Sequence, residues 1–216
     1  MDLNGDGILD VITGEYSPGN ILFFAGARGA LRKKLVVPER IDKTNDDFTM
    51  ATSYPVDWDG DGDFDLVVGS VKGKVFVNLN EGTCTEFRFG ERVPVLAVGK
   101  PLKVIQKSDP IPVDWDGDGI LDLLVGDEAT GVTFFKGARD RTFAPGISVF
   151  TGEPIPGQLA FEELLAWWQN QSKIPGYRAR LAVSDWNEDG KPDLLIGNCE
   201  EVENKTTGNV YVLLRQ

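Results

Sequence analysis

Four short apolar runs recur along this chain, and each is bounded by an aspartate at its start and a glycine at its end. The runs occupy residues 10–14, 65–69, 122–126 and 193–197. Each run is too short for a helix, and its apolar residues do not alternate with polar ones as they do in a strand with one face in water. The pattern therefore predicts four strands that are covered on both faces.

A polar segment of constant design leads into each run. Two of these segments contain the same octapeptide, Pro-Val-Asp-Trp-Asp-Gly-Asp-Gly, at residues 55–62 and 112–119, which are 57 positions apart. All four read D-x-[DN]-x-D-G-x-x-D, and we name them loop 1 (residues 2–10), loop 2 (57–65), loop 3 (114–122) and loop 4 (185–193). One such segment is typical of a solvated acidic turn, but four copies before matching strands indicate a repeated unit.

The spacing of oxygen-bearing side chains in these loops matches the needs of Ca²⁺. Acidic or amide side chains at positions 1, 3, 5 and 9, with glycine at 6, suit a hard cation that takes six to eight oxygen ligands, and the variable position 7 would contribute its backbone carbonyl. An EF-hand would instead have a Glu at position 12 and flanking helices. Because carboxylates this close repel one another unless a cation lies among them, we expect up to four bound Ca²⁺ ions. The predicted ligands are Asp2, Asn4, Asp6, Ile8 and Asp10 in loop 1, Asp57, Asp59, Asp61, Asp63 and Asp65 in loop 2, Asp114, Asp116, Asp118, Ile120 and Asp122 in loop 3, and Asp185, Asn187, Asp189, Lys191 and Asp193 in loop 4.

The rest of the chain fits repeats of four short strands joined by turns. Further strands are predicted at residues 20–25, 31–37, 51–56, 74–78, 87–93, 111–113, 131–136, 142–150, 178–184 and 209–214. Apolar residues at helical spacing predict one helix, inserted at residues 159–171. The first repeat lacks its opening strand and the last lacks its closing strand, which leaves fourteen strands of sixteen.

These features predict an all-β fold, a β-propeller of four-stranded antiparallel blades, because radial stacking covers the middle strands of each blade on both faces. Pro55 and Pro112 place the first strand of a blade at a sheet edge, where a missing N–H is tolerated. We expect a single domain with blades at about 1–45, 46–100, 101–158 and 172–216. The end blades would leave edges and apolar faces uncovered, so we expect an open arc or part of a larger propeller, covered by self-association or by remaining blades.

Composition excludes several classes of function. The formal charge of −12 argues against nucleic acid or an anionic membrane as a partner, and fourteen of the aspartates are predicted side-chain ligands of the four loops. The chain has no histidine, which removes His-based catalysis and His-ligated zinc. Its two cysteines, Cys84 and Cys199, form no C-x-x-C pair, so we expect free thiols, with a disulfide within or between chains as the alternative.

The sequence contains no predicted membrane span and no signal peptide. No apolar run approaches the roughly 18 residues that a spanning helix needs. Met1 stands directly before the first predicted ligand, so we expect the chain to be a piece of a longer protein or the product of a mis-started reading frame.

The loop and strand at residues 114–126 resemble the FG-GAP and VCBS repeats of β-propellers, which occur in integrin α-subunit heads and in large secreted bacterial proteins. The resemblance covers all four repeats, and the partial echoes of the FG-GAP signature at residues 24–27 and 135–138 favour the bacterial branch. It implies a propeller of seven or eight blades, with calcium held between the first two strands of each blade. It also implies an extracellular, periplasmic or cell-surface location. Asn4 and Asn187 replace Asp at position 3 and should lower the calcium affinity of loops 1 and 4.

We predict a calcium-binding, calcium-stabilised segment without catalytic activity that acts as a secreted binding or adhesion module for a glycan or a protein. One alternative is a polysaccharide-active enzyme, because rhamnogalacturonan lyases resemble this repeat family; its base would come from Tyr16, Tyr54, Lys103, Tyr177 or Arg178. The other alternative is a purely architectural segment of a larger surface protein.

The tryptophans carry two further predictions. Trp58, Trp115 and Trp186 share loop position 2 and are predicted to pack between blades. Trp167 and Trp168 belong to the inserted helix, where one would anchor the helix and the other would stack on a sugar ligand.

Overall fold

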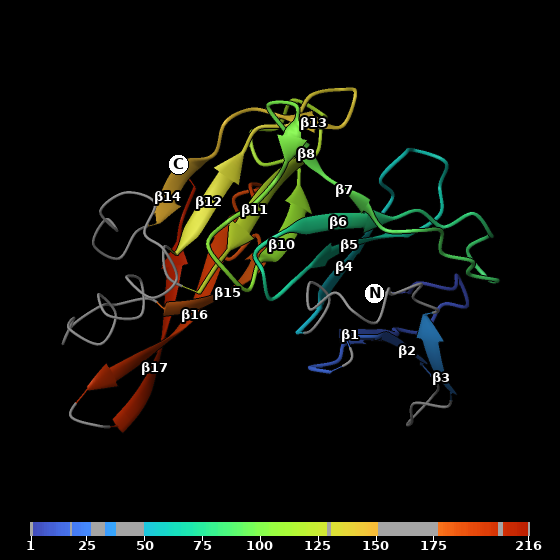
Figure 1. Ribbon diagram of the computed structural model, residues 1–216, viewed down its shortest axis with the longest axis horizontal. Coiled ribbons are helices and arrows are strands. Elements are labelled where there is room, and N and C mark those ends of the chain that lie inside the picture. The colour runs from blue at the N-terminus through green and yellow to red at the C-terminus, as the bar shows by residue number, and fades with distance from the viewer. Residues whose placement is uncertain are drawn as a thin grey trace.

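The structure, a computed structural model, consists of strands and loops in the parts of the chain that it describes. These parts are residues 2–17, 19–26, 33–37, 50–128, 131–150, 177–202 and 205–215. They contain no helix, and their strands form four sheets that follow one another along the chain, together with a smaller fifth sheet (Figure 1). The helix predicted at residues 159–171, with Trp167 and Trp168, lies outside the described residues.

Each of the four larger sheets is antiparallel with its strands in chain order, and we name these sheets blades 1 to 4. Blade 1 contains β1 (Val11–Gly14), β2 (Ile21–Ala25) and β3 (Lys33–Val37). Blade 2 contains β4 (Thr52–Val56), β5 (Asp65–Gly69), β6 (Val75–Asn78) and β7 (Val93–Pro94). Blade 3 contains β10 (Asp109–Val113), β11 (Asp122–Gly126), β12 (Val132–Phe135) and β14 (Ile147–Phe150). Blade 4 contains β15 (Tyr177–Ser184), β16 (Asp193–Val202) and β17 (Lys205–Leu213).

The fifth sheet ties the connection between blades 2 and 3 to a hairpin of blade 3. It contains β8 (Leu96–Ala97), β9 (Lys100–Pro101) and β13 (Thr142–Phe143). Strand β8 pairs antiparallel with β9 and parallel with β13, so the two blades are joined by backbone hydrogen bonds as well as by side-chain packing.

The propeller architecture confirms the central sequence prediction. Strands β5 and β11, which follow loops 2 and 3, are buried at every residue, as expected for strands with both faces covered. The proline-containing strands β4 and β10 are edge strands of their sheets. Blades 1 and 4 each have three described strands, whereas blades 2 and 3 have four.

Three strand predictions differ from the structure. The single strand expected at residues 142–150 is two strands, β13 and β14, which belong to different sheets. The last strand of blade 2 was expected at residues 87–93, but β7 is confined to Val93–Pro94 because the side chain of Asn80 draws the chain into a turn after β6. Asn80 Oδ1 accepts the N–H groups of Gly82 and Arg88, both at 3.0 Å. In blade 4 the hairpin of β16 and β17 continues past the expected ends at residues 197 and 209, since pairing persists as far as Val202 and Lys205.

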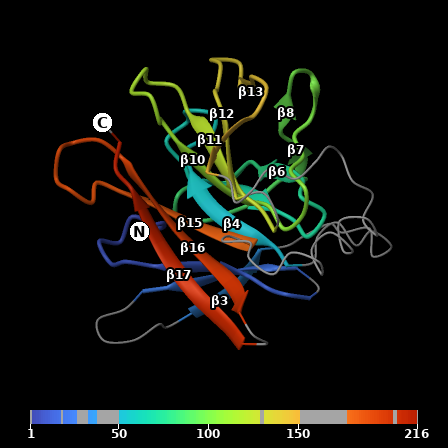
Figure 2. The ribbon, with the colours of Figure 1, turned by 90° about the vertical axis from the view of Figure 1, so that its left-hand side faces the viewer.

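Apolar side chains between successive blades form the core. One cluster joins blades 1 and 2, a second joins blades 2 and 3 with the connection between them, and a third joins blades 3 and 4. The extensive contacts between blades likewise join β1 with β4, β4 and β5 with β10, and β10 and β11 with β15. The blades thus fan out in chain order, and blade 4 forms the outermost face in Figure 2.

Cys84 is exposed and Cys199 is half-buried, and both are free thiols, as predicted. None of the described residues forms a helix that is long and apolar enough to cross a membrane.

Candidate metal centres

The four loops share a backbone conformation that depends on left-handed residues at positions 4 and 6. At position 6 a glycine has a positive φ in every loop, between 80° and 93°. Position 4 is also left-handed, and there Gly5, Gly60 and Gly117 are joined by Glu188 at φ 60°. Glycine reaches this region without steric cost, whereas Glu188 must be held there. The sequence analysis identified the glycine at position 6 but not the requirement at position 4.

The carboxylates at positions 1 and 5 accept backbone N–H groups of their own loop and so hold the loop in a tight turn. In loop 3, Asp114 Oδ1 accepts the N–H of Gly117 at 2.8 Å and Asp114 Oδ2 accepts the N–H of Gly119 at 2.9 Å. Asp118 Oδ1 then accepts the N–H of Ile120 at 2.9 Å. The bonds from the N–H groups of positions 6 and 7 recur in the other three loops, and the bond from position 4 recurs in loop 2.

The aspartate at position 9 links its loop to the third strand of the same blade. Asp122 Oδ2 accepts the N–H of Trp115 at 3.0 Å, and Oδ1 accepts the N–H of Gly137, just beyond β12, at 2.7 Å. Asp10, Asp65 and Asp193 make the equivalent pairs of bonds. Position 9 therefore has a structural role in addition to the ligand role that the sequence analysis assigned to it.

Burial and backbone hydrogen bonds shift the pKa values of three position 9 carboxyls in different directions. Desolvation raises the pKa of Asp65 and of Asp122 above the usual range, although backbone N–H groups oppose the change. The pKa of Asp193 is instead lowered, chiefly by the backbone N–H of Arg215.

Loops 2 and 3 bring carboxylates close enough for one cation. One carboxylate oxygen from each of Asp57, Asp59 and Asp61 lies within 4.8 Å of the other two, and the same holds for Asp114, Asp116 and Asp122. Ligands on opposite sides of a Ca²⁺ ion are roughly 5 Å apart, given Ca–O distances of about 2.3–2.6 Å. The oxygen donors and their spacing in both loops fit Ca²⁺.

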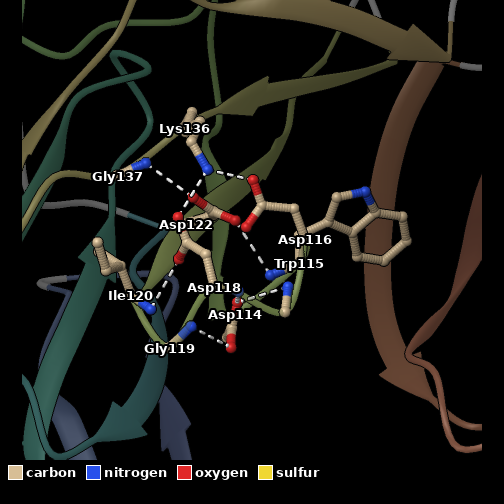
Figure 3. Close-up of polar contacts among 10 residues, drawn as sticks. Asp114, Trp115, Asp116, Asp118, Gly119, Ile120, Asp122, Lys136 and Gly137 are labelled. Atoms are coloured by element: carbon tan, nitrogen blue, oxygen red, sulfur yellow. Dashed lines mark hydrogen bonds and ion pairs between the residues drawn. The ribbon is translucent and has the colours of Figure 1, made fainter.

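A lysine distinguishes loop 3 from the other loops. Figure 3 shows the Lys136 ammonium directed at the carboxylates of Asp116 and Asp118. The distance from Nζ to Asp118 Oδ2 is 2.8 Å, and Nζ also forms an ion pair with Asp116. These contacts lower the pKa of Asp118 and raise that of Lys136.

Loops 1 and 4 use an amide in place of the acid at position 3. Asn187 Oδ1 accepts the N–H of Asp189 at 3.1 Å, while Asn187 Nδ2 donates to Asp189 Oδ2 at 3.1 Å. Asn4 and Asp6 form the same pair of bonds, at 3.0 and 3.3 Å. Each of these loops therefore has three carboxylates at positions 1, 3, 5 and 9, whereas loops 2 and 3 each have four.

Comparison with protein families agrees with this geometry. The family model described as the FG-GAP-like repeat matches residues 2–68 and 114–196, which contain all four loops. The chain belongs to the FG-GAP-like repeat family.

Among solved structures, this FG-GAP-like repeat chain is similar to a lectin from Agrocybe aegerita described as recognising non-reducing terminal N-acetylglucosamine. The two share 19% sequence identity with a TM-score of 0.42, over 94% of this chain and 52% of the lectin chain. The chain thus spans about half the length of that lectin. No curated protein sequence matches the chain.

The remaining predicted site residues of this FG-GAP-like repeat chain are spread over several elements. The position 7 residues Ile8, Asp63, Ile120 and Lys191 each donate a backbone N–H to the position 5 carboxylate. The residues considered as a lyase base come from separate places: Tyr16 follows β1, Tyr54 lies in β4, Lys103 follows β9, and Tyr177 and Arg178 begin β15. Lys136 was not predicted as a site residue, because it lies 18 residues after Asp118 and its place beside loop 3 depends on the pairing of β11 with β12.

Proposed function

We propose that this chain is a calcium-stabilised propeller segment that serves as a binding module outside the cell. The carboxylate clusters of loops 2 and 3 carry the proposal, because three carboxylate oxygens within 4.8 Å of one another are a poor arrangement without a cation. Calcium would supply the positive charge that offsets their repulsion. In loop 2 the ion would be held by Asp57, Asp59 and Asp61, and in loop 3 by Asp114, Asp116 and Asp122.

The metal would act structurally in this module. Each loop joins the first and second described strands of blades 2, 3 and 4, and its position 9 aspartate reaches the third strand. An ion bound at positions 1, 3 and 5 of loop 2, or at positions 1, 3 and 9 of loop 3, would therefore hold a hairpin that is already fixed to the middle of its blade. The expected consequence is a large gain in the stability of the fold and no direct part in chemistry.

Thermal unfolding with and without calcium tests this role. A ligand that binds only the folded state at 100 times its Kd stabilises it by about 2.7 kcal/mol per site, which is roughly 5–10 °C for a chain of this length. The double variant Asp59→Asn and Asp61→Asn keeps an oxygen at both positions and should lose part of the gain. Glu86→Gln, an exposed change outside the loops, is the matched control. An unchanged melting temperature in excess chelator would refute the calcium role.

The ligand of the module is proposed to be a glycan or a protein. Membership of the FG-GAP-like repeat family supports a binding role, and the absence of histidine together with the dispersed lyase candidates gives no support to catalysis. A glycan array probed in calcium and in chelator is the direct test, with calcium-dependent binding as the expected result. Release of an ultraviolet-absorbing unsaturated product from pectic polysaccharides would instead favour the lyase alternative. The sugar-stacking role of Trp167 or Trp168 stays a prediction, checked on the same array with Trp167→Ala.

A further inference from the structure

The hydrogen bonds of the position 9 aspartates define which residues are equivalent at the ends of β2, β6, β12 and β17, each of which pairs with the strand that follows its loop. Their Oδ1 atoms accept the N–H groups of Gly26, Asn80, Gly137 and Arg215 in blades 1 to 4. The residues directly before these are Ala25, Leu79, Lys136 and Leu214. Only blade 3 has a cation at this position.

The ammonium of Lys136 lies among the oxygens that are proposed to hold calcium. It pairs with Asp116 at position 3 and with Asp118 at position 5 (Figure 3). Asp116 is also one of the three carboxylates whose oxygens lie within 4.8 Å of one another. An ammonium here already supplies positive charge to this cluster, so a divalent ion must displace it or bind against its repulsion.

Loop 2 is a natural control, because it has the same octapeptide and a different neighbour. Leu79 takes the place of Lys136, is partly buried, and packs against the core between blades 2 and 3. Within the described ranges, no ion pair joins a loop 2 carboxylate to a Lys or Arg side chain. The two loops thus share the aspartates at positions 1, 3, 5 and 9 with and without a tethered cation, and they differ at position 7, where loop 2 has Asp63 and loop 3 has Ile120.

We propose that Lys136 is the built-in counter-ion of loop 3 and that it sets the calcium affinity of this loop below that of loop 2. This inference rests on the proposed calcium-binding function and adds that loops 2 and 3 differ in their calcium affinity and in their dependence on calcium. Loop 3 keeps its fold without calcium through Lys136, whereas loop 2 depends on the ion. Loop 2 therefore fills first as calcium rises.

The expected difference in affinity is about tenfold. The Lys136, Asp116 and Asp118 side chains are between 36% and 45% exposed, so their attraction is weaker than in a dry interior and stronger than in bulk water. The ion pair is broken when calcium enters loop 3, and that loss weakens binding there.

The test is a calcium titration followed by NMR at two backbone amides. Gly62 donates its N–H to Asp57 Oδ2 in loop 2 and Gly119 donates to Asp114 Oδ2 in loop 3, so each amide reports on one loop. In the unaltered protein the Gly62 signal should reach its midpoint at about tenfold lower calcium than the Gly119 signal. Lys136→Met, which removes the charge and keeps most of the length of the side chain, should bring the Gly119 midpoint down toward that of Gly62, with any remaining difference due to Asp63 at position 7 of loop 2.

Two exchanges serve as controls. Lys136→Arg keeps the charge and should leave the Gly119 midpoint high, and Leu79→Lys should raise the Gly62 midpoint without moving that of Gly119. Equal midpoints in the unaltered protein, or an unchanged Gly119 midpoint in Lys136→Met, would overturn the inference and leave the proposed function standing. If neither amide responds to calcium, the proposed function fails and the inference fails with it.

Discussion

Some residues at equivalent positions of the repeat are buried in blade 2 or blade 3 and exposed in blade 4. Trp58 at loop position 2 of blade 2 is 6% exposed and packs near Phe143 of β13, whereas Trp186 at the same position of blade 4 is 60% exposed. We call the glycine at the end of each apolar run the motif glycine, and a valine pairs with it in blades 2, 3 and 4. The exposure of this valine follows the same trend, since Val75 and Val132 are 1% and 0% exposed and Val210 is 74% exposed. The same residue types at the same register are core in one blade and surface in another.

The motif glycines show why the covered blades need this sequence. A Cβ atom on Gly14, Gly69 or Gly126 would lie 1.9, 2.0 or 2.7 Å from a carbonyl oxygen at the start of the first strand of the following blade. A Cβ atom on Gly197 would meet only its own blade, at 3.9 Å. The glycine therefore serves the contact with the next blade, and blade 4 has the glycine without that contact.

Every repeat therefore encodes the residues for both sides of an interface between blades. Whether a given copy is buried depends on the presence of a neighbouring blade and not on the copy itself. Blade 4 carries a complete set of interface residues on an open face (Figure 2). Substitutions at equivalent positions should accordingly have unequal effects.

Replacing the position 2 tryptophans should produce the largest difference. Trp58→Ala removes a buried ring that also lies 5.7 Å from the Arg141 guanidinium, and we expect a loss of about 3–5 kcal/mol in the free energy of unfolding. Trp186→Ala should change it by about 0.5 kcal/mol or less, because the ring is mostly in water. Urea unfolding in excess chelator measures both. Equal losses would mean that a covering element packs on Trp186 in solution.

Adding one methyl group to the motif glycines should give the next largest contrast. In Gly69→Ala the new Cβ meets the backbone of Ser108, which cannot move aside without shifting β10, and we expect a loss of about 1–3 kcal/mol. Gly197→Ala has room for the methyl group and should be close to neutral. Thermal unfolding distinguishes the two, and a destabilised Gly197→Ala variant would contradict the assignment of this glycine to the interface with a following blade.

The sequence could predict the blades because each repeat carries its own signals. The octapeptides, the apolar runs and the edge prolines are local features, and they sufficed for the order of strands within the blades and for the acidic clusters, but not for the fifth sheet of β8, β9 and β13. The exposure of Trp186 could not be predicted, since it depends on a neighbour and not on loop 4. Lys136 was missed for a related reason, because its approach to Asp118 arises from the pairing of β11 with β12. The structural role of Asp122 could not be predicted for the same reason, because its partner Gly137 directly follows β12 and is brought to Asp122 by the same pairing of strands.

A carboxyl between blades 3 and 4 should give a smaller, pH-dependent effect. Asp109 Oδ2 accepts the N–H of Leu181 at 3.1 Å across the interface, and burial raises the pKa of Asp109 although Arg180 opposes the change. A raised pKa means that the folded state holds the proton more tightly than the unfolded state. This contribution to stability is therefore present below the unfolded pKa and is lost as pH rises through the folded one.

Asp109→Asn should remove this pH dependence while keeping an oxygen for Leu181. We expect the variant to gain stability relative to the unaltered protein between acid and neutral pH, by about 1 kcal/mol or less. Asp140→Asn is the control of opposite sign, because bonds from Thr142 lower the pKa of Asp140. Denaturant unfolding across this pH range measures both variants, and parallel curves for Asp109→Asn and the unaltered protein would contradict the prediction.

The smallest expected effect concerns position 4 of the loops, where the end blade again differs from the covered ones. Glu188 has φ 60°, whereas Gly60 and Gly117 occupy the equivalent positions of loops 2 and 3. The left-handed conformation costs a residue with a Cβ atom about 1–2 kcal/mol, and glycine avoids this cost but loses more chain entropy on folding. Glu188→Gly should therefore stabilise the protein by about 0.5 kcal/mol, and Gly117→Glu should destabilise it by a similar or larger amount. Both shifts can be resolved by chemical denaturation in chelator, and a destabilised Glu188→Gly variant would show that the Glu188 side chain makes a contact stronger than its backbone strain.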